Sequence, residues 1–251
     1  MVHFVGAGSG AEDLITVRGM NHLKAADCVV YAGSLVNPKL LDYCKPETEI
    51  FNSALMTLEE VMDILISRSQ ADKYVVRLHT GDPSLYGAIG EQIRELNRLG
   101  IKYDVTPGVS AAFSAAASLC QELTLPGISQ SIILTRMEGK TPMPEKESII
   151  NFAKIGATMA IYLSASDAAG LKSQLLEGGY NLSTPVAICH KVSWPDEKIY
   201  ITDVEHMDTV VERENLKLTT LFLVGEVLGA NDFLKSRLYA SDFTTIFREG
   251  V

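Results

Sequence analysis

Short apolar runs and amphipathic stretches alternate along this chain. "HFVGAG" and "DCVVYAG" are apolar runs that end in glycine, a pattern that predicts buried strands followed by tight turns. "KYVVRLHTGDPSLYG" predicts a β-branched strand that ends at a Gly-Asp-Pro turn, and "YDVTPG" predicts a further strand and turn. The first half of the chain therefore contains several strands, each ending at small turn residues.

Helical periodicity is clearest between Thr57 and Gln70. Thr57 and Glu60 have the spacing of a capping box, which satisfies backbone N–H groups at the start of a helix. One face of this helix carries Leu58, Val61, Met62, Leu65 and Ile66. A second helix follows the Gly-Asp-Pro turn. Its inward face carries Ile89, Ile93 and Leu96, and Gly100 ends it. An alanine-rich helix begins at Ser110.

The second half of the chain repeats the alternation. Its predicted strands are "SIILT", "ATMAIYLS", "PVAICHKV", "EKIYIT" and "TTLFLVG", and two of its predicted helices span Glu145 to Lys154 and Ala168 to Glu177. This alternation predicts an α/β fold of two domains with mostly parallel sheets flanked by helices. We place the domains at residues 1–117 and 118–251, the second with a C-terminal helical tail, and the boundary region at residues 114–128. We expect a cleft where the two domains pack.

Length and composition fit a globular chain. The 251 residues are 47% hydrophobic and 21% charged, and no apolar run approaches the ~18 to 20 residues of a membrane-spanning helix. The start of the sequence lacks the basic flank and apolar core of a signal peptide, so we expect a cytoplasmic protein with no membrane partner. The net charge of −9 and the lack of a basic run disfavour a general affinity for nucleic acid.

The metal-ligating residue types are scattered. No two cysteines form a C-x-x-C pair and no two histidines have the H-E-x-x-H spacing. We therefore expect reduced thiols and no metal held by the protein. The residues concerned are Cys28, Cys44, Cys120, Cys189, His3, His22, His79, His190 and His206.

The opening segment "VGAGSG" invites comparison with a dinucleotide-binding loop. That loop needs G-x-G-x-x-G, whereas this chain has G-x-G-x-G with Ala11 at the position of the third glycine. The acidic residue expected at the end of the second strand is missing, since Asp27 precedes that strand. The segment is better interpreted as a tight strand-to-helix turn, and a nicotinamide or flavin cofactor is disfavoured.

Six segments occur in an order that resembles the tetrapyrrole (corrin/porphyrin) methylase family. They are "VGAGSG", "YAGSLVNP", "GDPSLYG", "TPGVSA", "RMEGKTPMPE" and "VSWPDEKIY". Within that family, "YAGSLVNP" and the last two segments resemble the members that methylate C11 of precorrin-4 or of its cobalt complex. The resemblance extends from Val2 to about Gly229.

This resemblance implies a two-lobed fold, a homodimer, and S-adenosylmethionine bound between the lobes, with S-adenosylhomocysteine as a product. Cobalt would enter only as part of the tetrapyrrole substrate. The positions that match the family's cofactor contacts are Thr80, Gly81, Asp82, Leu85, Ser110, Ala111, Leu163, Ala187, Val192 and Thr220. Relatives commonly have proline and aspartate where this chain has Ser9 and Ala11, so the role of these two positions is left open.

Methyl transfer from a sulfonium is an in-line displacement, which requires alignment and exclusion of water more than a protein nucleophile. The acetate and propionate arms of a corrinoid precursor call for cationic side chains. Arg136 is the first candidate, followed by Lys140, Lys191, Arg18 and Arg77, and each could instead be a surface cation or ion pair.

Several roles stay open at this stage. No catalytic residue is assigned, because the candidate bases Glu138, Asp104 and Tyr86 qualify by residue type only. Asp82 could receive a polar cofactor group or cap the helix that follows it, and Trp194 could pack beside the macrocycle or hold a loop in place. The alternative functions are another methylase of the same fold, acting on a different precorrin, uroporphyrinogen III or diphthine, and a non-catalytic tetrapyrrole carrier.

Overall fold

The computed structural model describes residues 1–33, 35–237 and 240–249. Ser34, within the "YAGSLVNP" segment, lies outside the described residues. The chain forms two compact units: Met1–Ser118 together with Lys191–Glu197, and Leu119–His190 together with Lys198–Val251. The assignment of Lys191–Glu197 to the first unit is a feature that a single boundary in the sequence does not describe. The division into domains at residues 117 and 118 stays a prediction.

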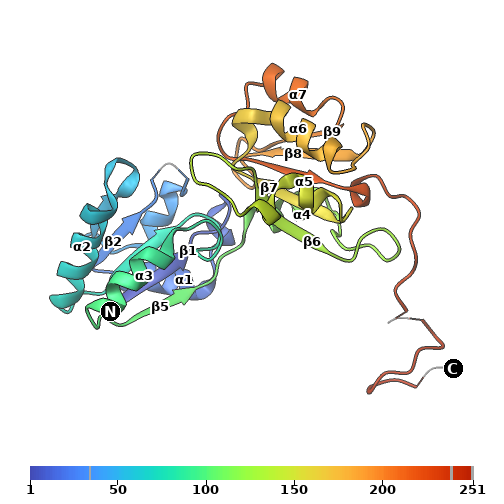
Figure 1. The fold of residues 1–251 in the computed structure, drawn as a ribbon. Helices are drawn as coiled ribbons and strands as arrows, with labels where there is room; N and C mark the ends of the chain where they lie inside the picture. The colour runs from blue at the N-terminus through green and yellow to red at the C-terminus, as the bar shows by residue number, and fades with distance from the viewer. Residues whose placement is uncertain (34, 238–239, 250–251) are drawn as a thin grey trace. The chain divides into compact units, whose positions relative to one another are not determined.

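Unit 1 is built on a five-stranded sheet in the order β3-β2-β4-β1-β5. All four pairings in this sheet are parallel, as the alternation of strands and helices predicts. Figure 1 shows the sheet and its flanking helices in blue to green. The strands are β1 (Val2–Gly6), β2 (Cys28–Tyr31), β3 (Glu49–Asn52), β4 (Val75–His79) and β5 (Tyr103–Thr106).

Alternate strand residues face opposite layers of helices, so this sheet is covered on both faces. Val5, Val29 and Val76 pack with α1 (Val17–Ala25) and the 3-10 helix η2 (Pro38–Tyr43). Phe4 and Val30 pack on the other face with α2 (Leu58–Gln70) and α3 (Ile89–Arg98). Burial on both faces explains the nearly continuous apolar runs of these strands.

The predicted helix at residues 57–70 is confirmed. Thr57 accepts a hydrogen bond from the Glu60 N–H at 3.2 Å, and the Glu60 carboxylate accepts one from the Thr57 N–H at 2.8 Å. Val61, Met62 and Leu65 are buried against the sheet. The capping box therefore sets the start of α2, and the apolar face sets its orientation. The alanine-rich helix α4 (Ala111–Ser118) also belongs to unit 1.

Unit 2 contains a mixed sheet in the order β6-β7-β10-β8-β9. The first pairing is parallel and the other three are antiparallel. The loop Lys191–Glu197 between β8 and β9 is too short for the crossover that parallel neighbours need, so the two strands form a hairpin. The strands are β6 (Ile132–Arg136), β7 (Thr158–Tyr162), β8 (Pro185–His190), β9 (Lys198–Asp203) and β10 (Thr220–Val224).

The helices of unit 2 are α5 (Ile149–Ala153), α6 (Ala168–Glu177) and α7 (Met207–Arg213), and they pack on a core that includes Met159 and Phe222. The predicted helix at residues 145–154 begins later than expected. Residues Glu145–Glu147 form a 3-10 turn, and the Ser148 side chain then accepts from the Asn151 N–H and caps α5.

The tail of the chain differs from its prediction, since the described residues after 229 include no α-helix. Phe233, Leu234, Ile246 and Phe247 have 47 to 92% of their surface exposed, so no packed face stabilises a helix there. Among the described residues, no helix is long and apolar enough to cross a membrane.

Candidate functional site

Three glycines bring together the loops that follow β1, β4 and β5 at the carboxyl edge of the first sheet. A Cβ atom added to Gly6 would lie 2.6 Å from Cα of Gly108, and one added to Gly108 would lie 2.1 Å from the carbonyl oxygen of Gly81. Gly81 also has a φ of +59°, in the left-handed region that favours glycine. A side chain has no space at Gly6 or Gly108, so the three loops meet backbone to backbone.

Gly8 and Gly81 extend this contact by pairing as an isolated antiparallel bridge. The Gly81 N–H donates to the Gly8 carbonyl at 2.7 Å, and the Gly8 N–H donates to the Gly81 carbonyl at 3.3 Å. The glycines of "VGAGSG" thus join two loops of the same sheet edge. This arrangement supports their interpretation as a tight turn.

The position of this edge in the sheet is informative. β1 and β4 are neighbours, yet the chain passes from β1 toward β2 on one side and from β4 toward β5 on the other. Neighbouring strands whose connections depart in opposite directions form a topological switch point, where open α/β sheets bind their ligands at the carboxyl ends of the strands. Gly8 and Gly81 bridge at this point.

Asp82 ties the loop after β4 to the loop after β5. One carboxylate oxygen accepts hydrogen bonds from the N–H and hydroxyl of Ser84, and the other accepts from the Gly108 N–H at 2.9 Å. Burial acts to raise the pKa of this carboxyl, but the bonds from Ser84 and Gly108 outweigh it and the pKa is lowered. The ionised Asp82 therefore orders the two loops and caps the turn.

The other predicted cofactor positions of unit 1 surround this link. Thr80, Leu85 and Ala111 are half-buried, and Ser110 is buried. The Ser110 carbonyl accepts from the N–H groups of Phe113 and Ser114 at 3.1 and 3.2 Å, which starts α4.

Backbone strain marks the end of the loop after β4. Tyr86 and Ala88 have φ values of +57° and +52°, in a region that residues other than glycine seldom occupy. Strain of this kind gathers at ligand-binding segments. It therefore adds to the functional interpretation of the loop.

Leu163 and Thr220 share one edge of the second sheet. Phe222 pairs with Ile161 in antiparallel register, which places Thr220, at the start of β10, beside the residue that follows β7. Leu163 is 69% exposed at a φ of +53°. The Thr220 hydroxyl lies 3.1 Å from Nδ1 of His190 and donates to the Leu218 carbonyl at 3.0 Å.

Ala187 and Val192 occupy different environments from these two. Ala187 is fully buried in β8, where it pairs with Leu223. Val192 is buried in the loop Lys191–Glu197 of unit 1. The side chains of both residues are therefore closed to a ligand.

Arg136 ends β6 and turns back onto the loop that follows. Its guanidinium donates to the carbonyls of Met137, Thr141 and Pro142 at 2.9 to 3.3 Å. Arg136 therefore holds this loop in shape, and the exposed side chain of Lys140 lies within it. The positive charges of Arg136 and Lys140 therefore both lie on this loop of unit 2.

The remaining predicted cations lie apart from one another. Arg18 is exposed on α1, and Lys191 forms an ion pair with Asp196 at 2.5 Å. Arg77 is only 8% exposed in the middle of β4, donates to the Val30 carbonyl at 3.2 Å, and has its pKa lowered to about 10 by burial. Arg77 faces the core and is dropped from the candidate substrate contacts.

The candidate bases lie in three different environments. The Glu138 carboxylate accepts from the Met143 N–H at 3.4 Å, and Tyr86 is 44% exposed in the strained loop. Asp104 belongs to a cluster with His3 and His22 whose possible ligand atoms lie within 4.8 Å of one another. Sequence spacing gave no sign of this cluster, because its members come from three separate elements.

Both histidines of this cluster form hydrogen bonds through their Nδ1 atoms. Nδ1 of His3 lies 2.9 Å from the Asp104 carboxylate, and Nδ1 of His22 lies 2.7 Å from the Tyr74 hydroxyl. Burial and the neighbouring His3 lower the pKa of His22, and the charge of Arg18 acts in the same direction. We interpret the cluster as a hydrogen-bonded link between β1, α1 and β5.

A family model described as Tetrapyrrole (Corrin/Porphyrin) Methylases matches residues 1–208. The chain belongs to this family. It is 49% identical over 248 residues to the cobalt-precorrin-4 C(11)-methyltransferase of Methanocaldococcus jannaschii, covering 99% of this chain and 96% of that one. It is 43% identical over 249 residues to the precorrin-4 C(11)-methyltransferase of Pseudomonas aeruginosa, covering 99% of each.

Solved structures agree with this assignment. The X-ray structure of a cobalt precorrin-4 methyltransferase superposes with a TM-score of 0.88 at 41% identity, over 90% of this methylase and 95% of that chain. Uroporphyrin-III C-methyltransferase from Thermus thermophilus gives a TM-score of 0.75 at 30% identity, over 91% and 93% of the two chains. The expected α/β methylase fold is thus confirmed.

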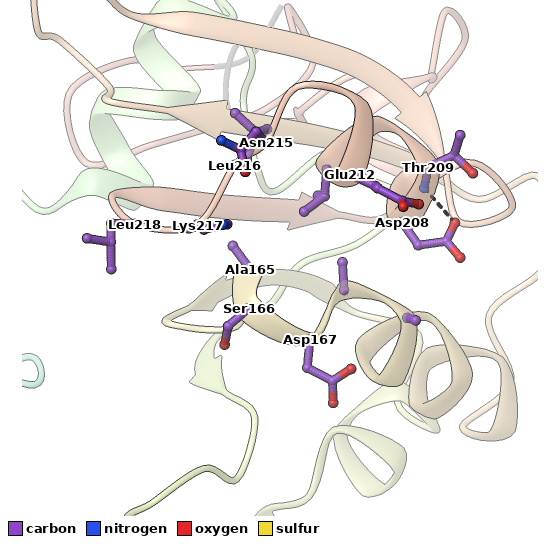
Figure 2. A pocket seen from close by; sticks show the side chains of 13 residues that line it. Ala165, Ser166, Asp167, Asp208, Thr209, Glu212, Asn215, Leu216, Lys217 and Leu218 are labelled. Carbon is purple, nitrogen blue, oxygen red and sulfur yellow. Dashed lines mark hydrogen bonds between the residues drawn. The ribbon is translucent and has the colours of Figure 1, made fainter.

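The methylase also has a pocket of about 580 Å³ in unit 2 (Figure 2). Asp167, Asp208 and Glu212 contribute carboxylates to its lining, and Lys217 contributes an amine. Asp167 caps α6 by accepting from the Gly170 N–H at 2.9 Å, and Asp208 pairs with Lys172 at 3.1 Å. The excess of carboxylates disfavours an anionic macrocycle here. No sequence motif indicated this pocket.

Proposed function

We propose that this methylase transfers the methyl group of S-adenosylmethionine to C11 of precorrin-4, in its cobalt-containing form, during cobalamin biosynthesis. The observation that carries the proposal is the 49% identity to a relative named for this reaction, which extends over nearly the whole of both chains. Cobalt belongs to the substrate and needs no site in the protein.

The donor is proposed to bind at the carboxyl edge of the first sheet. Thr80, Gly81, Asp82 and Leu85 line the loop after β4, and Ser110 and Ala111 follow the loop after β5. Glycine contacts hold these loops together, so backbone groups can approach the donor closely. Because the Asp82 carboxylate is bound by Ser84 and Gly108, its proposed role is to order the loop.

Leu163, Ala187, Val192 and Thr220 stay proposed donor contacts, on the strength of the family resemblance. Leu163 and Thr220 share one edge of the second sheet, and Leu163 presents an exposed apolar side chain. Ala187 and Val192 have buried side chains, so their proposed contacts use backbone atoms only.

The chemistry asks little of the protein in the way of acid or base. The electron pair of the ring carbon attacks the methyl carbon, the carbon–sulfur bond breaks, and S-adenosylhomocysteine leaves as a neutral thioether. The protein contributes by aligning the two reactants and excluding water. A base is needed only for a proton lost around the macrocycle, and no residue is assigned to that role.

Carboxylate arms of the substrate are proposed to meet the cations of this chain. Lys140 is exposed on the loop held by Arg136, so Arg136 would act by presenting Lys140 as well as by its own charge. Arg18 and Lys191 stay secondary candidates. Charge-assisted hydrogen bonds of this kind are stronger than neutral ones and give direction to binding.

A labelled methyl donor tests the function directly. The protein is incubated with isotopically labelled S-adenosylmethionine and precorrin-4, with and without cobalt, and the label is located on the product ring. Label at C11, with faster turnover of the cobalt form, supports the proposal. Label at another carbon would indicate a different methylase of the same fold, and binding of the macrocycle without release of S-adenosylhomocysteine would indicate a carrier.

We also propose a cytoplasmic homodimer. The tail exposes Phe233, Leu234, Ile246 and Phe247, apolar side chains that a second copy could cover. Light scattering during size-exclusion chromatography tests the assembly, with the dimer expected. A monomer at micromolar concentration would contradict it.

A further inference from the structure

The loop Lys191–Glu197, here called the strap, joins β8 to β9 but makes its contacts within unit 1. Its own hydrogen bonds hold it in a compact turn. The Trp194 N–H donates to the Lys191 carbonyl and the Glu197 N–H donates to the Trp194 carbonyl, each at 3.0 Å. Lys191 and Asp196 close the strap with an ion pair at 2.5 Å. The strap is therefore an ordered element.

Trp194 is seated directly on the glycine loop that follows β1. Its indole N–H donates to the Ser9 carbonyl at 3.1 Å. A Cβ atom added to Gly10 would lie 2.2 Å from Cδ1 of the indole, so the ring covers Gly10 without space for any side chain. This contact explains the third glycine of "VGAGSG". The glycine accommodates the tryptophan ring of the strap.

Ser193 binds the same loop through its hydroxyl. The Ala11 N–H donates to it at 3.1 Å, and the Ser9 hydroxyl lies 2.8 Å from it. The Ser9 hydroxyl also lies 2.6 Å from that of Ser114 on α4, which completes a chain of three hydroxyl groups. The Ser9 hydroxyl is the middle member of this chain, so both of its hydroxyl contacts depend on the serine.

The far end of the strap is fixed as well. One Glu197 carboxylate oxygen accepts from the Ser193 N–H at 2.5 Å and from the Ser118 hydroxyl at 3.1 Å. Because Ser118 ends α4, the strap contacts this helix at both Ser114 and Ser118, with the Ser114 contact running through Ser9. The strap therefore joins the glycine loop to the helix that begins at the proposed donor contacts.

The opposite side of the glycine loop is held by other groups. Asn37, which is buried, donates to the Gly10 carbonyl at 2.8 Å. Two hydrogen bonds join Gly8 to Gly81, which lies in the loop after β4. This loop, with Thr80, Gly81, Asp82 and Leu85, is here called the donor loop. The glycine loop is thus held by the strap, by Asn37 and by the donor loop. A shift at Gly10 would pass along the backbone of Ser9 and Gly8 and reach Gly81 through the two hydrogen bonds.

We propose that Ser193 and Trp194 are positioning residues, which fix the donor loop for methyl transfer by holding Ser9 and Gly10 against the strap. The proposal rests on the proposed function, because it assumes that Gly81 and Asp82 contact S-adenosylmethionine. Trp194 contacts the glycine loop through Ser9 and Gly10. Its effect on the reaction should therefore appear first in the affinity for the donor.

Trp194 is the single tryptophan of the chain, so its fluorescence reports the state of the strap. The experiment compares wild type with Gly10→Ala, Trp194→Phe and Ser193→Ala. Ser67→Ala is the matched control, since the exposed Ser67 hydroxyl donates to the Ile64 carbonyl of its own helix. Affinity for S-adenosylhomocysteine is measured by calorimetry, and kcat and KM are measured with the proposed substrates.

In Gly10→Ala the added methyl group displaces the indole, so we expect a red-shifted emission and a donor affinity weaker by about tenfold or more. Trp194→Phe loses one hydrogen bond and Ser193→Ala two, and a weakening of about fivefold is expected for each. The KM for the macrocycle should change less than the affinity for the donor. Ser67→Ala should match wild type.

A shifted emission in Gly10→Ala with unchanged donor affinity and kcat would overturn the proposal. If Gly10→Ala does not fold, Trp194→Phe and Ser193→Ala decide the matter, and values equal to those of Ser67→Ala would overturn it. Wild-type protein that binds no S-adenosylhomocysteine would contradict the proposed function itself. Failure of the strap alone is therefore distinguishable from failure of the function.

Discussion

The carbonyl oxygen of Gly81 lies 2.1 Å from the position that a Cβ atom on Gly108 would occupy. The two glycines follow β4 and β5, strands that are separated in the sheet by β1. Their contact joins the two loops proposed to hold the donor, and Asp82 reinforces it through the Gly108 N–H at 2.9 Å. The geometry of this sheet edge therefore depends on the absence of a side chain at Gly108.

Gly108→Ala should separate the two loops. A methyl group cannot fit beside the Gly81 carbonyl, so we expect donor affinity to fall by tenfold or more and stability to fall by about 1–3 kcal/mol. Calorimetry with S-adenosylhomocysteine and thermal unfolding measure the two effects. Gly90→Ala is the control, because a Cβ at Gly90 in α3 meets nothing within 4 Å. Unchanged donor affinity in Gly108→Ala would show that these two loops do not bind the donor.

Arg136→Ala should weaken binding of the macrocycle more than binding of the donor. Loss of the guanidinium frees the carbonyls of Met137, Thr141 and Pro142 and loosens the loop that carries Lys140. We expect the KM for the tetrapyrrole to rise about tenfold and donor affinity to change less than about twofold. Steady-state kinetics with each substrate varied in turn measures this. Equal effects on both substrates would argue against a role in holding carboxylates, and Arg98→Ala, an exposed arginine paired with Glu95, serves as control.

Arg77→Met should leave the KM values unchanged. Arg77 is a buried cation that bonds one backbone carbonyl, so its burial carries a desolvation cost. We expect its replacement by an apolar chain to be neutral or to stabilise the fold by about 1–3 kcal/mol. Urea unfolding and steady-state kinetics together test this. A raised KM for the tetrapyrrole would show that Arg77 does contribute to substrate binding.

His79 should make unit 1 less stable in acid. Burial, and secondarily the charge of Arg77, lower the pKa of His79 to about 3. Its value in the unfolded chain is about 6.5, so the unfolded state takes up a proton as the pH falls below that value while the folded state does not. The stability present above pH 6.5 is therefore lost progressively as the pH falls toward 3, by about 2 kcal/mol between pH 7 and pH 5.

Urea unfolding at pH 7 and pH 5, followed by the fluorescence of Trp194 in the same unit, measures this loss. His79→Leu should lose about 2 kcal/mol less than wild type over this interval. Ser67→Ala, a change at a non-titrating side chain of unit 1, should keep the wild-type difference. The same pH dependence in His79→Leu and wild type would show that other groups cause it.

Local patterns predicted much of the fold. The capping box of Thr57 and Glu60 and the apolar face of α2 depend on residues a few positions apart, so the sequence displays them directly. The parallel sheet of unit 1 follows from strands separated by helices. The antiparallel pairings of unit 2 were not foreseen, because strand order depends on which distant strands meet.

The parts of the candidate site that depend on neighbouring residues could be predicted from sequence motifs. The parts that depend on contacts between distant residues could not. The turn after β4 was predicted from "GDPSLYG", and its Asp82 accepts a hydrogen bond from the N–H of Ser84, two residues further on. The contact between Ser9 and Ser193 joins residues 184 positions apart, and that between His3 and Asp104 joins residues 101 positions apart. The burial of Arg77 could not be predicted either, because the sequence of β4 does not show which helices cover each face of the strand.

The location of the bound donor is the central test. A crystal structure of the protein with S-adenosylhomocysteine should place the ligand against Gly81 and Asp82, with Ser110 and Ala111 beside it. A ligand bound elsewhere, for example in the acidic pocket lined by Asp167 and Glu212, would contradict the proposed donor site.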